Sequence, residues 1–202
     1  MLTEQPALRA VDVELARRCV RGERDAQREF FHAHRHRVHH VLYRMLGTNR
    51  EIDDLIQEAF VEILRSLPGF RGDSRLATWI DRICVRVAQG HFVERARWRA
   101  HVPLLELVAL DDPASGPDRR AEAREAARRL YAILDGVEPS HRIAFALHVI
   151  DGRPLRDIAH VMGASVVATK LRVWRTRQRV NAAARRDPVL QGWLEESSGG
   201  VP

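Results

Sequence analysis

Residues 51–67 carry the most regular helical pattern in the chain, and this pattern restricts the fold more than any other stretch. Apolar residues recur at spacings that line one face of a helix: Ile52, Leu55, Ile56, Ala59, Phe60, Ile63, Leu64 and Leu67. Acidic residues cover the other faces: Glu51, Asp53, Asp54, Glu58 and Glu62. They are concentrated in the first turns, where the positive end of the helix dipole stabilises negative charge. From the pattern alone, this acidic surface is interpreted as a solvated helix face. The continuous apolar face must pack against other elements.

The same spacing of three to four residues between apolar positions runs through almost the whole chain, whereas β-branched runs between turn signals are scarce. These features predict an all-α protein. Helices are expected over about residues 12–22, 24–46, 51–67, 74–98, 121–134 and 139–150, followed by two shorter periodic segments between 155 and 186.

Breaker residues divide the chain into two small helical domains. The stretch 102–120 is acidic and rich in proline and glycine, which predicts a flexible linker between a first domain at 1–101 and a second at 121–186. Asp187-Pro188 is expected to end the last helix, and the Gly/Ser-rich remainder, 187–202, is predicted to be a mobile tail.

The stretch Leu155–Arg186 has the pattern of a helix-turn-helix. Gly163-Ala164 separates a short apolar-periodic segment from a second one, and Ser165 suits the N-cap position of the latter. From Ser165 to Arg186 there are seven basic residues and no acidic one: Lys170, Arg172, Arg175, Arg177, Arg179, Arg185 and Arg186. A helix with this charge is expected to meet DNA phosphates, the alternative being a solvated cationic face of an ordinary bundle helix.

Charge and cysteine content restrict the setting of the protein. A net charge of +6 and a pI near 10.4 favour a polyanionic partner. Cys19 and Cys84 stand apart without zinc-ligand spacing, as expected of reduced thiols in the cytoplasm. The N-terminus lacks a signal-peptide pattern, and no apolar run approaches the ~20 residues of a membrane helix. A cytoplasmic protein without membrane insertion is therefore expected.

The sequence contains no pattern that predicts an active site, a cofactor site or a metal site. Five histidines crowd one expected helix: His32, His34, His36, His39 and His40. Pairs spaced by four residues can bind a metal, but no glutamate follows as in HExxH and no cysteine lies near. The cluster is interpreted as a solvated helix face, and a metal-dependent enzyme remains the weaker alternative.

Several of these segments together resemble the extracytoplasmic-function (ECF) group of bacterial RNA polymerase sigma factors, within the sigma-70 family. Asp53–Ser74 is very similar to the family's core-polymerase-binding helix and the loop after it. Thr78–Ile83 resembles its promoter-melting helix, and Leu155–Val180 resembles its second DNA-binding module. The resemblance implies a non-enzymatic transcription initiation factor that binds core RNA polymerase and promoter DNA at the −10 and −35 elements. It also implies an anti-sigma factor as a partner.

The resemblance assigns roles to individual residues of this chain. Those at core-polymerase-binding positions are Asp53, Asp54, Gln57, Glu58 and Phe60. Those at −10-binding positions are Arg71, Arg75, Trp79, Arg82 and Arg86. Those at −35-binding positions are Ser165, Lys170, Leu171, Arg172, Trp174 and Arg175.

The chain also departs from the family pattern. Arg86 stands where many relatives carry asparagine, and Gly90 stands where they carry a polar residue. Residues 167–169 (Val-Ala-Thr) replace the common Gly-Thr-Val, and Pro154 replaces a hydroxyl cap. These departures leave the promoter sequence open. A stand-alone helix-turn-helix repressor or activator is the alternative function, and the acidic helix at 51–67 argues against it.

Overall fold

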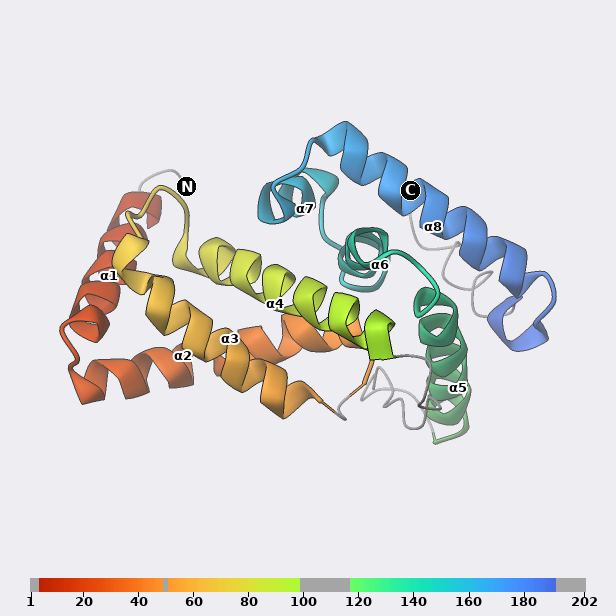
Figure 1. Cartoon of the computed structure of the whole chain (residues 1–202), viewed down its shortest axis with the longest axis horizontal. Helices are drawn as coiled ribbons and strands as arrows, with labels where there is room; N and C mark the ends of the chain where they lie inside the picture. The colour runs from red at the N-terminus through yellow and green to blue at the C-terminus, as the bar shows by residue number, and fades with distance from the viewer. Residues whose placement is uncertain (1–3, 49–50, 99–116, 192–202) are drawn as a thin grey trace.

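The computed structural model describes residues 4–48, 51–98 and 117–191. Within these ranges the regular elements are all helical and no strand is present, so the predicted all-α class is confirmed (Figure 1). The N-terminal half consists of α1 (Glu4–Val20), α2 (Arg24–Leu46), α3 (Ile52–Ser66), the short 3₁₀ helix η1 (Leu67–Gly69) and α4 (Leu76–Trp98). The C-terminal half consists of α5 (Pro117–Leu134), α6 (Pro139–Phe145), the π-helical turn η2 (Ala146–Ile150), α7 (Leu155–Met162) and α8 (Val166–Ala184).

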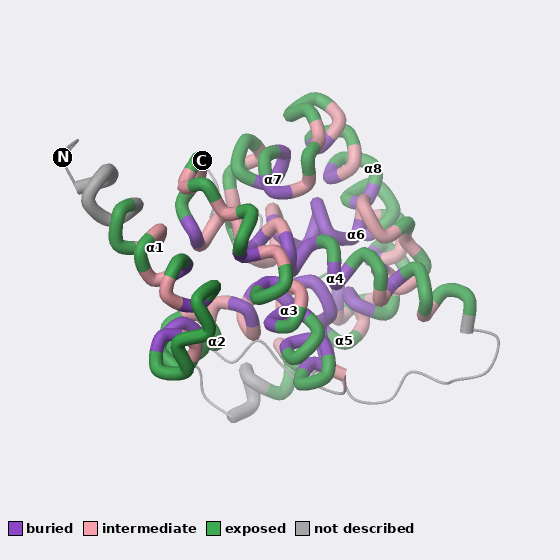
Figure 2. Tube along the Cα trace, turned by 60° about the vertical axis from the view of Figure 1, so that its left-hand side comes forward, coloured by how far each residue is buried: buried purple, intermediate pink, exposed green. Residues whose placement is uncertain are grey.

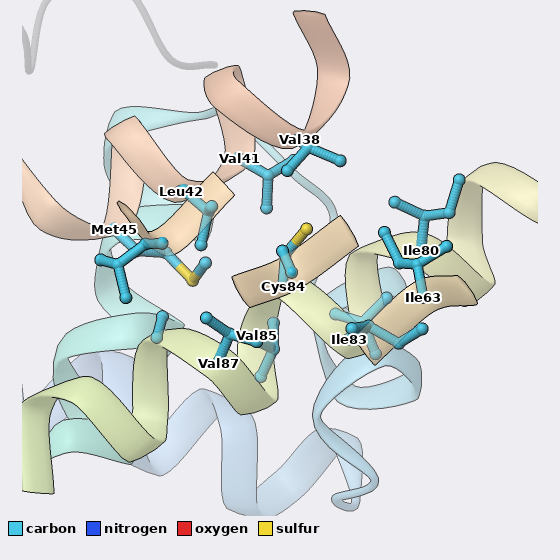
Figure 3. Close-up of a cluster of buried hydrophobic side chains, with 14 of the residues drawn as sticks. Val38, Val41, Leu42, Met45, Ile63, Ile80, Ile83, Cys84, Val85 and Val87 are labelled. Carbon is cyan, nitrogen blue, oxygen red and sulfur yellow. The ribbon is translucent and has the colours of Figure 1, made fainter. Parts of the chain in front are cut away.

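The core of the N-terminal half lies where α2, α3 and α4 pack against one another. Figure 3 shows its buried side chains meeting from the three helices: Val38, Val41, Leu42 and Met45 from α2, Ile63 from α3, and Ile80, Ile83, Cys84, Val85 and Val87 from α4. These positions recur at helical spacing in the sequence, so the apolar pattern accounts for which face each helix buries.

The core of the C-terminal half is smaller and continues past α8. It contains Leu130, Tyr131, Leu134, Phe145, Val180, Ala184 and Leu190. Residues 188–191 form a further helical turn, and Asp187 caps it by accepting from the backbone N–H of Val189 at 3.1 Å. The tail was predicted to start at residue 187, whereas the structure places residues 188–191 in this helical turn with Leu190 buried in the core. Residues 192–202 lie outside the described residues.

Three helix boundaries differ from the sequence prediction. The first helix begins at Glu4 instead of residue 12. α5 begins at Pro117 instead of residue 121, because the fixed φ of proline suits the first helical position. The end of the expected helix 139–150 widens into a π turn, in which the N–H of Asp151 donates to the carbonyl of Ala146 at 2.9 Å. Of the predicted linker 102–120, residues 102–116 lie outside the described residues.

The two halves share one apolar core in this structure. The larger core cluster includes six residues of the C-terminal half: Ile143, Ala144, Leu147, Ile158, Val161 and Val173. α4 packs against α6 and α7, and α2 packs against η2. Figure 2 shows the buried residues concentrated around α4, which packs against both α3 and α6, with exposed residues outside them. The sequence predicted two domains and carried no signal that their cores would merge.

Candidate nucleic-acid and protein interfaces

The exposed face of α3 carries the acidic residues of the predicted core-polymerase site. Asp53, Asp54, Gln57 and Glu58 are all exposed on this helix. Phe60 differs from them, because it is only 7% exposed and its ring centroid lies 4.6 Å from that of Phe31 on α2. Phe60 therefore packs under this exposed face, and a partner that binds the face contacts mainly the residues around Phe60.

Two apolar side chains extend the acidic face of α3 toward its C-terminal end. Val61 and Leu64 are exposed, and helical spacing places them in line with Gln57. The sequence pattern assigned Leu64 to the buried stripe and did not single out Val61, although Val61 lies four residues after Gln57. Acidic groups beside an apolar patch make a surface suited to a protein partner.

The predicted −10-binding residues form a line along α4. Arg75 immediately precedes the helix, and Trp79, Arg82 and Arg86 follow at intervals of four, three and four, which places them on one face. Trp79 is half-buried with its ring centroid 5.5 Å from that of Phe70, so it belongs partly to the core and partly to the surface. Arg71 is exposed in the loop before α4.

Beyond Arg86 the same helix forms a shallow hollow. Its lining contains Arg86, Gln89, Gly90, Val93, Glu94 and Arg97. A side chain at Gly90 would meet no atom within 4 Å, so packing does not require glycine at this position. The absence of a polar side chain at residue 90 therefore changes the chemistry of an open surface.

One member of the α4 line contacts the C-terminal half. Arg82 donates from Nε to the carbonyl of His160 on α7 at 3.3 Å, and its Nη2 lies 2.7 Å from Nε2 of the same histidine. α7 packs against both α4 and α8. In this arrangement α7 covers the middle of the predicted −10 surface.

A buried ion cluster, here called the Asp81 cluster, fastens the two halves beside this contact. The carboxylate of Asp81 accepts two hydrogen bonds from Arg37 of α2, at 2.8 and 2.7 Å, and one from Arg153 at 2.7 Å. Arg153 also donates to Asp151 at 2.5 Å, and His40 lies 2.7 Å from the other oxygen of Asp151. Although burial by itself would lower the pKa of Arg153, the two carboxylates raise it.

A second buried arginine connects the halves near the end of α2. Arg142 of α6 is 2% exposed and donates to the carbonyls of Met45 and Leu46, at 3.1 and 2.7 Å. A third hydrogen bond goes to Asp135, and the guanidinium carbon lies 4.3 Å from the ring centroid of Phe92 on α4. Burial lowers the pKa of Arg142, and the carboxylate of Asp135 opposes that effect. The arginine satisfies carbonyls that the helix end leaves open.

α7 and α8 are joined by a short turn whose two ends are capped by Gly163 and Ser165. Gly163 adopts the left-handed conformation, with φ of 61°, and its N–H donates to the carbonyl of His160. The Ser165 side chain caps α8 by accepting from the N–H of Ala168 at 3.1 Å. Its hydroxyl is therefore committed to the cap, which positions the helix.

The predicted −35-binding residues lie mainly on the outer face of α8. Lys170, Leu171, Trp174 and Arg175 are exposed, whereas Arg172 is half-buried at the edge of this face. The opposite side of the helix is buried: Thr169, Val173, Thr176, Val180 and Ala184. One face is thus free for a ligand while the other is held by the C-terminal half.

The histidines of α2 have individual surroundings. His40 belongs to the Asp81 cluster, and His34 lies with its ring 4.6 Å from that of Phe30. In the described part of the chain, no group of three or more histidine, cysteine, aspartate or glutamate residues is placed to hold a metal ion. Cys19 and Cys84 are both buried as free thiols. Among the described helices, none is long and apolar enough to cross a bilayer.

Comparison with known proteins identifies relatives of both halves. Residues 30–99 match the family described as Sigma-70 region 2. The chain is 28% identical over 201 residues to the RNA polymerase sigma-H factor of Pseudomonas aeruginosa, covering 95% of this chain and 99% of that relative. It is 25% identical over 178 residues to the ECF RNA polymerase sigma-E factor of Escherichia coli, covering 84% of this chain and 92% of the relative.

Two solved structures have a similar fold. CnrH, in complex with the cytosolic domain of CnrY, matches with a TM-score of 0.57 at 22% identity, covering 87% of this chain and 98% of that chain. The sigma factor RpoE of Bartonella quintana, in complex with the anti-sigma factor NepR, matches with a TM-score of 0.56 at 18% identity. That match covers 79% of this chain and 97% of the RpoE chain.

Proposed function

Because the chain is an extracytoplasmic-function sigma factor of the sigma-70 family, we propose that three of its surfaces bind its three targets. Such a factor initiates transcription by directing RNA polymerase to promoters. The acidic face of α3 binds core polymerase, the line of residues on α4 binds the −10 element, and the outer face of α8 binds the −35 element. Sigma factors are in general not enzymes, and the chemistry of transcription belongs to the polymerase. The factor works in the cytoplasm.

The separation of charge between α3 and α8 is the observation that carries this proposal. The exposed face of α3 presents Asp53, Asp54 and Glu58, whereas α8 contains no acidic residue at all. A basic chain with an acidic surface suits two kinds of partner, since complementary charge sets the register and the rate of association. The acidic face meets a protein, and the basic faces meet DNA.

The α3 contact combines charge with apolar burial. Asp53, Asp54, Gln57 and Glu58 form the polar part of the proposed core-binding surface, and Val61 and Leu64 add an apolar part. Phe60 packs beneath this surface against Phe31 and keeps the helix in position. Apolar contacts at the centre of an interface contribute affinity, while the charged groups around them select the partner.

The α4 contact suits an unpaired strand. Arg71, Arg75, Arg82 and Arg86 supply cations for phosphates, and the half-exposed ring of Trp79 offers a surface on which a base can stack. Because α7 holds Arg82, the −10 surface becomes fully accessible only when the C-terminal half moves away from α4. We infer that the factor opens when it binds core polymerase.

The α8 contact suits a duplex. Lys170, Arg172 and Arg175 can bind phosphates or the O6 and N7 acceptors of guanine, whereas Leu171 and Trp174 offer apolar contacts. Ser165 acts through the cap that sets the first turn of the helix. A helix whose outer face is basic and whose inner face is buried can enter the major groove.

An anti-sigma factor is proposed as a further partner of this chain. The two solved structures described above are of complexes, CnrH with the cytosolic domain of CnrY and RpoE with the anti-sigma factor NepR. Such a partner would hold the factor away from polymerase. Co-purification of the full chain from its source cells, with and without the inducing stress, would identify the partner.

Reconstituted transcription tests the function as a whole. Purified full-length chain and core RNA polymerase from the same bacterium are combined on a promoter library, and the transcripts are sequenced. We expect a defined set of start sites with a shared −10 and −35 sequence that core polymerase alone does not use. If the chain neither binds core polymerase nor selects start sites, this proposal is wrong. Binding to duplex DNA alone, without core binding, would instead favour the stand-alone regulator.

A further inference from the structure

The outer face of α8 carries an apolar stripe in which two assigned −35 residues, Leu171 and Trp174, are joined by a third residue that has no assigned role, Val167. Val167, Leu171 and Trp174 are 78%, 43% and 56% exposed, and their spacing of four and three places them in one row. This row is here called the α8 stripe. Val167, its most exposed member, lies in the first turn of α8, two residues after the Ser165 cap.

Basic side chains flank the α8 stripe on both sides. At 3.6 residues per turn, Lys170 falls on one flank and Arg175 on the other, and both are exposed. The ligand that fits this face therefore has an apolar centre between two rows of negative charge. The major groove has this arrangement, because phosphates border it on both sides and its floor carries the C5 methyl groups of thymine.

The position of Val167 suits contact with the groove floor. The N-terminal residues of a recognition helix reach the base edges, and an α-helix fits the width of the groove. A valine side chain has no donor or acceptor and one strongly preferred rotamer in a helix, so it can recognise a base only through shape and apolar contact. Among the four bases, only thymine presents a methyl group in the major groove.

Resting on the proposed function, we propose that Val167, with Leu171 beside it, reads thymine by its methyl group in the −35 element. Val167 is then a specificity-determining residue, and its departure from the glycine of many relatives gives this factor a thymine preference. A protein helix with an apolar face is the competing occupant of the α8 stripe. The basic flanks on both sides and the absence of acidic residues in α8 favour DNA.

Replacement of thymine by deoxyuridine tests this proposal, because uracil keeps every hydrogen-bonding group and lacks only the methyl. Holoenzyme made from the full chain and core polymerase first selects −35 sequences from a random duplex library. Each thymine of the selected element is then replaced singly by deoxyuridine, and the affinities are compared. We expect at least one position at which deoxyuridine weakens binding about three- to fivefold, the value of one buried methyl group.

The variant Val167→Ala assigns that effect to the side chain. In this variant the thymine and deoxyuridine duplexes should bind equally at the sensitive position, while other positions keep their ratios. Val11→Ala, which shortens an exposed valine on α1, is the matched control and should preserve the wild-type ratios.

Three outcomes would overturn the inference. Equal thymine-to-uracil ratios in wild type and Val167→Ala at every position would show that the valine reads no methyl group. If these ratios are equal and Val167→Ala also no longer co-purifies with an anti-sigma factor, the α8 stripe is a protein-docking surface. If the holoenzyme selects no sequence at all, the proposed function fails and this inference fails with it.

Discussion

The guanidinium of Arg153 lies 2.7 Å from the carboxylate of Asp81 across the boundary between the two halves of the chain. Asp81 belongs to α4, the helix that carries the proposed −10 surface, and Arg153 precedes α7, the helix that covers it. Arg37 of α2 binds the same carboxylate, so three segments converge on one buried negative charge. The ion pair therefore links the accessibility of the −10 surface to the position of the C-terminal half.

Removal of the central carboxylate should loosen this arrangement. In Asp81→Ala the guanidinium groups of Arg37 and Arg153 lose their shared partner. Because Arg37 is 40% exposed and Arg153 keeps Asp151, we expect the loss of stability to fall below the ~3–5 kcal/mol of a fully buried broken pair. We expect a lower free energy of unfolding in urea and a larger radius of gyration by X-ray scattering. Asp73→Ala, at an exposed position in the loop before α4, is the control and should change neither quantity. An unchanged radius of gyration in Asp81→Ala would show that the cluster does not hold the halves together.

Gly47 is required for two reasons that can be separated. It ends α2 with φ of 75°, and a Cβ placed there would lie 2.3 Å from the ring of Tyr131. Gly47→Ala should therefore lower the free energy of unfolding by more than the ~1–2 kcal/mol of left-handed strain. The additional loss arises because Tyr131 must also move, which weakens its hydrogen bond to the carbonyl of Arg44. Gly152→Ala provides the comparison, since Gly152 has φ of 69° and open space around its Cβ position. If urea denaturation shows the same decrease in the free energy of unfolding for Gly47→Ala and Gly152→Ala, the Tyr131 contact has no role.

The charge of the α3 face can be tested without disturbing the core. Asp54→Arg reverses an exposed charge at the centre of the proposed core-binding surface, so we expect loss of binding to core polymerase. Binding of the same variant to duplex −35 DNA should match wild type, because α8 is unaffected. Asp25→Arg makes the same reversal at an exposed position of α2 and should bind core polymerase normally. Equal loss of both activities in Asp54→Arg would contradict the proposed division between α3 and α8.

The half-buried position of Arg172 predicts a phosphate contact. It lies at the edge of the outer face of α8, away from the α8 stripe, so we expect it to meet the phosphates at the rim of the groove. We expect Arg172→Ala to weaken −35 binding by a similar factor for all sequences and to reduce the slope of log affinity against log salt by about 0.9. Affinities measured over a salt series on the selected element and a scrambled duplex test this. A loss confined to one base position, of ~1–3 kcal/mol, would reassign Arg172 to base reading.

Local patterns account for most of the secondary structure. The helix expected over residues 24–46 matches α2, and Ser165 and Gly163 occupy the capping positions that their side chains and backbone favour. The pattern misassigned Leu64, which lies at the edge of the apolar stripe of α3. Residues at such an edge are buried only if a neighbouring helix reaches them, and the sequence pattern of one helix does not show this. Residues 188–191 form a helical turn that the sequence did not indicate, since the short segment Asp-Pro-Val-Leu-Gln at 187–191 is too short to show a helical period.

Some residues of the candidate surfaces can likewise be predicted from local sequence, and others cannot. Charge and helical spacing are sufficient to place the acidic residues on the exposed face of α3 and the basic residues on α8. The apolar pattern placed Phe60 on the face of α3 that packs, as its 7% exposure agrees, whereas the resemblance placed it among the core-binding positions, because a resemblance identifies a position in the chain and not its burial. Val61 could have been found from its spacing of four residues from Gln57. Val167 was noted only as a departure from the family pattern.

By itself, the sequence determined the all-α class, the positions of the helices and the separation of acidic from basic surfaces, because each depends on residues a few positions apart. Only the tertiary structure decided that the two halves share a core. The hydrogen bond between Asp81 and Arg153 joins residues 72 positions apart, and the bond from Arg142 to Met45 spans 97. Nothing in a local pattern selects such partners, since a charged residue is solvated by default and becomes buried only where the fold supplies its counterion or carbonyls.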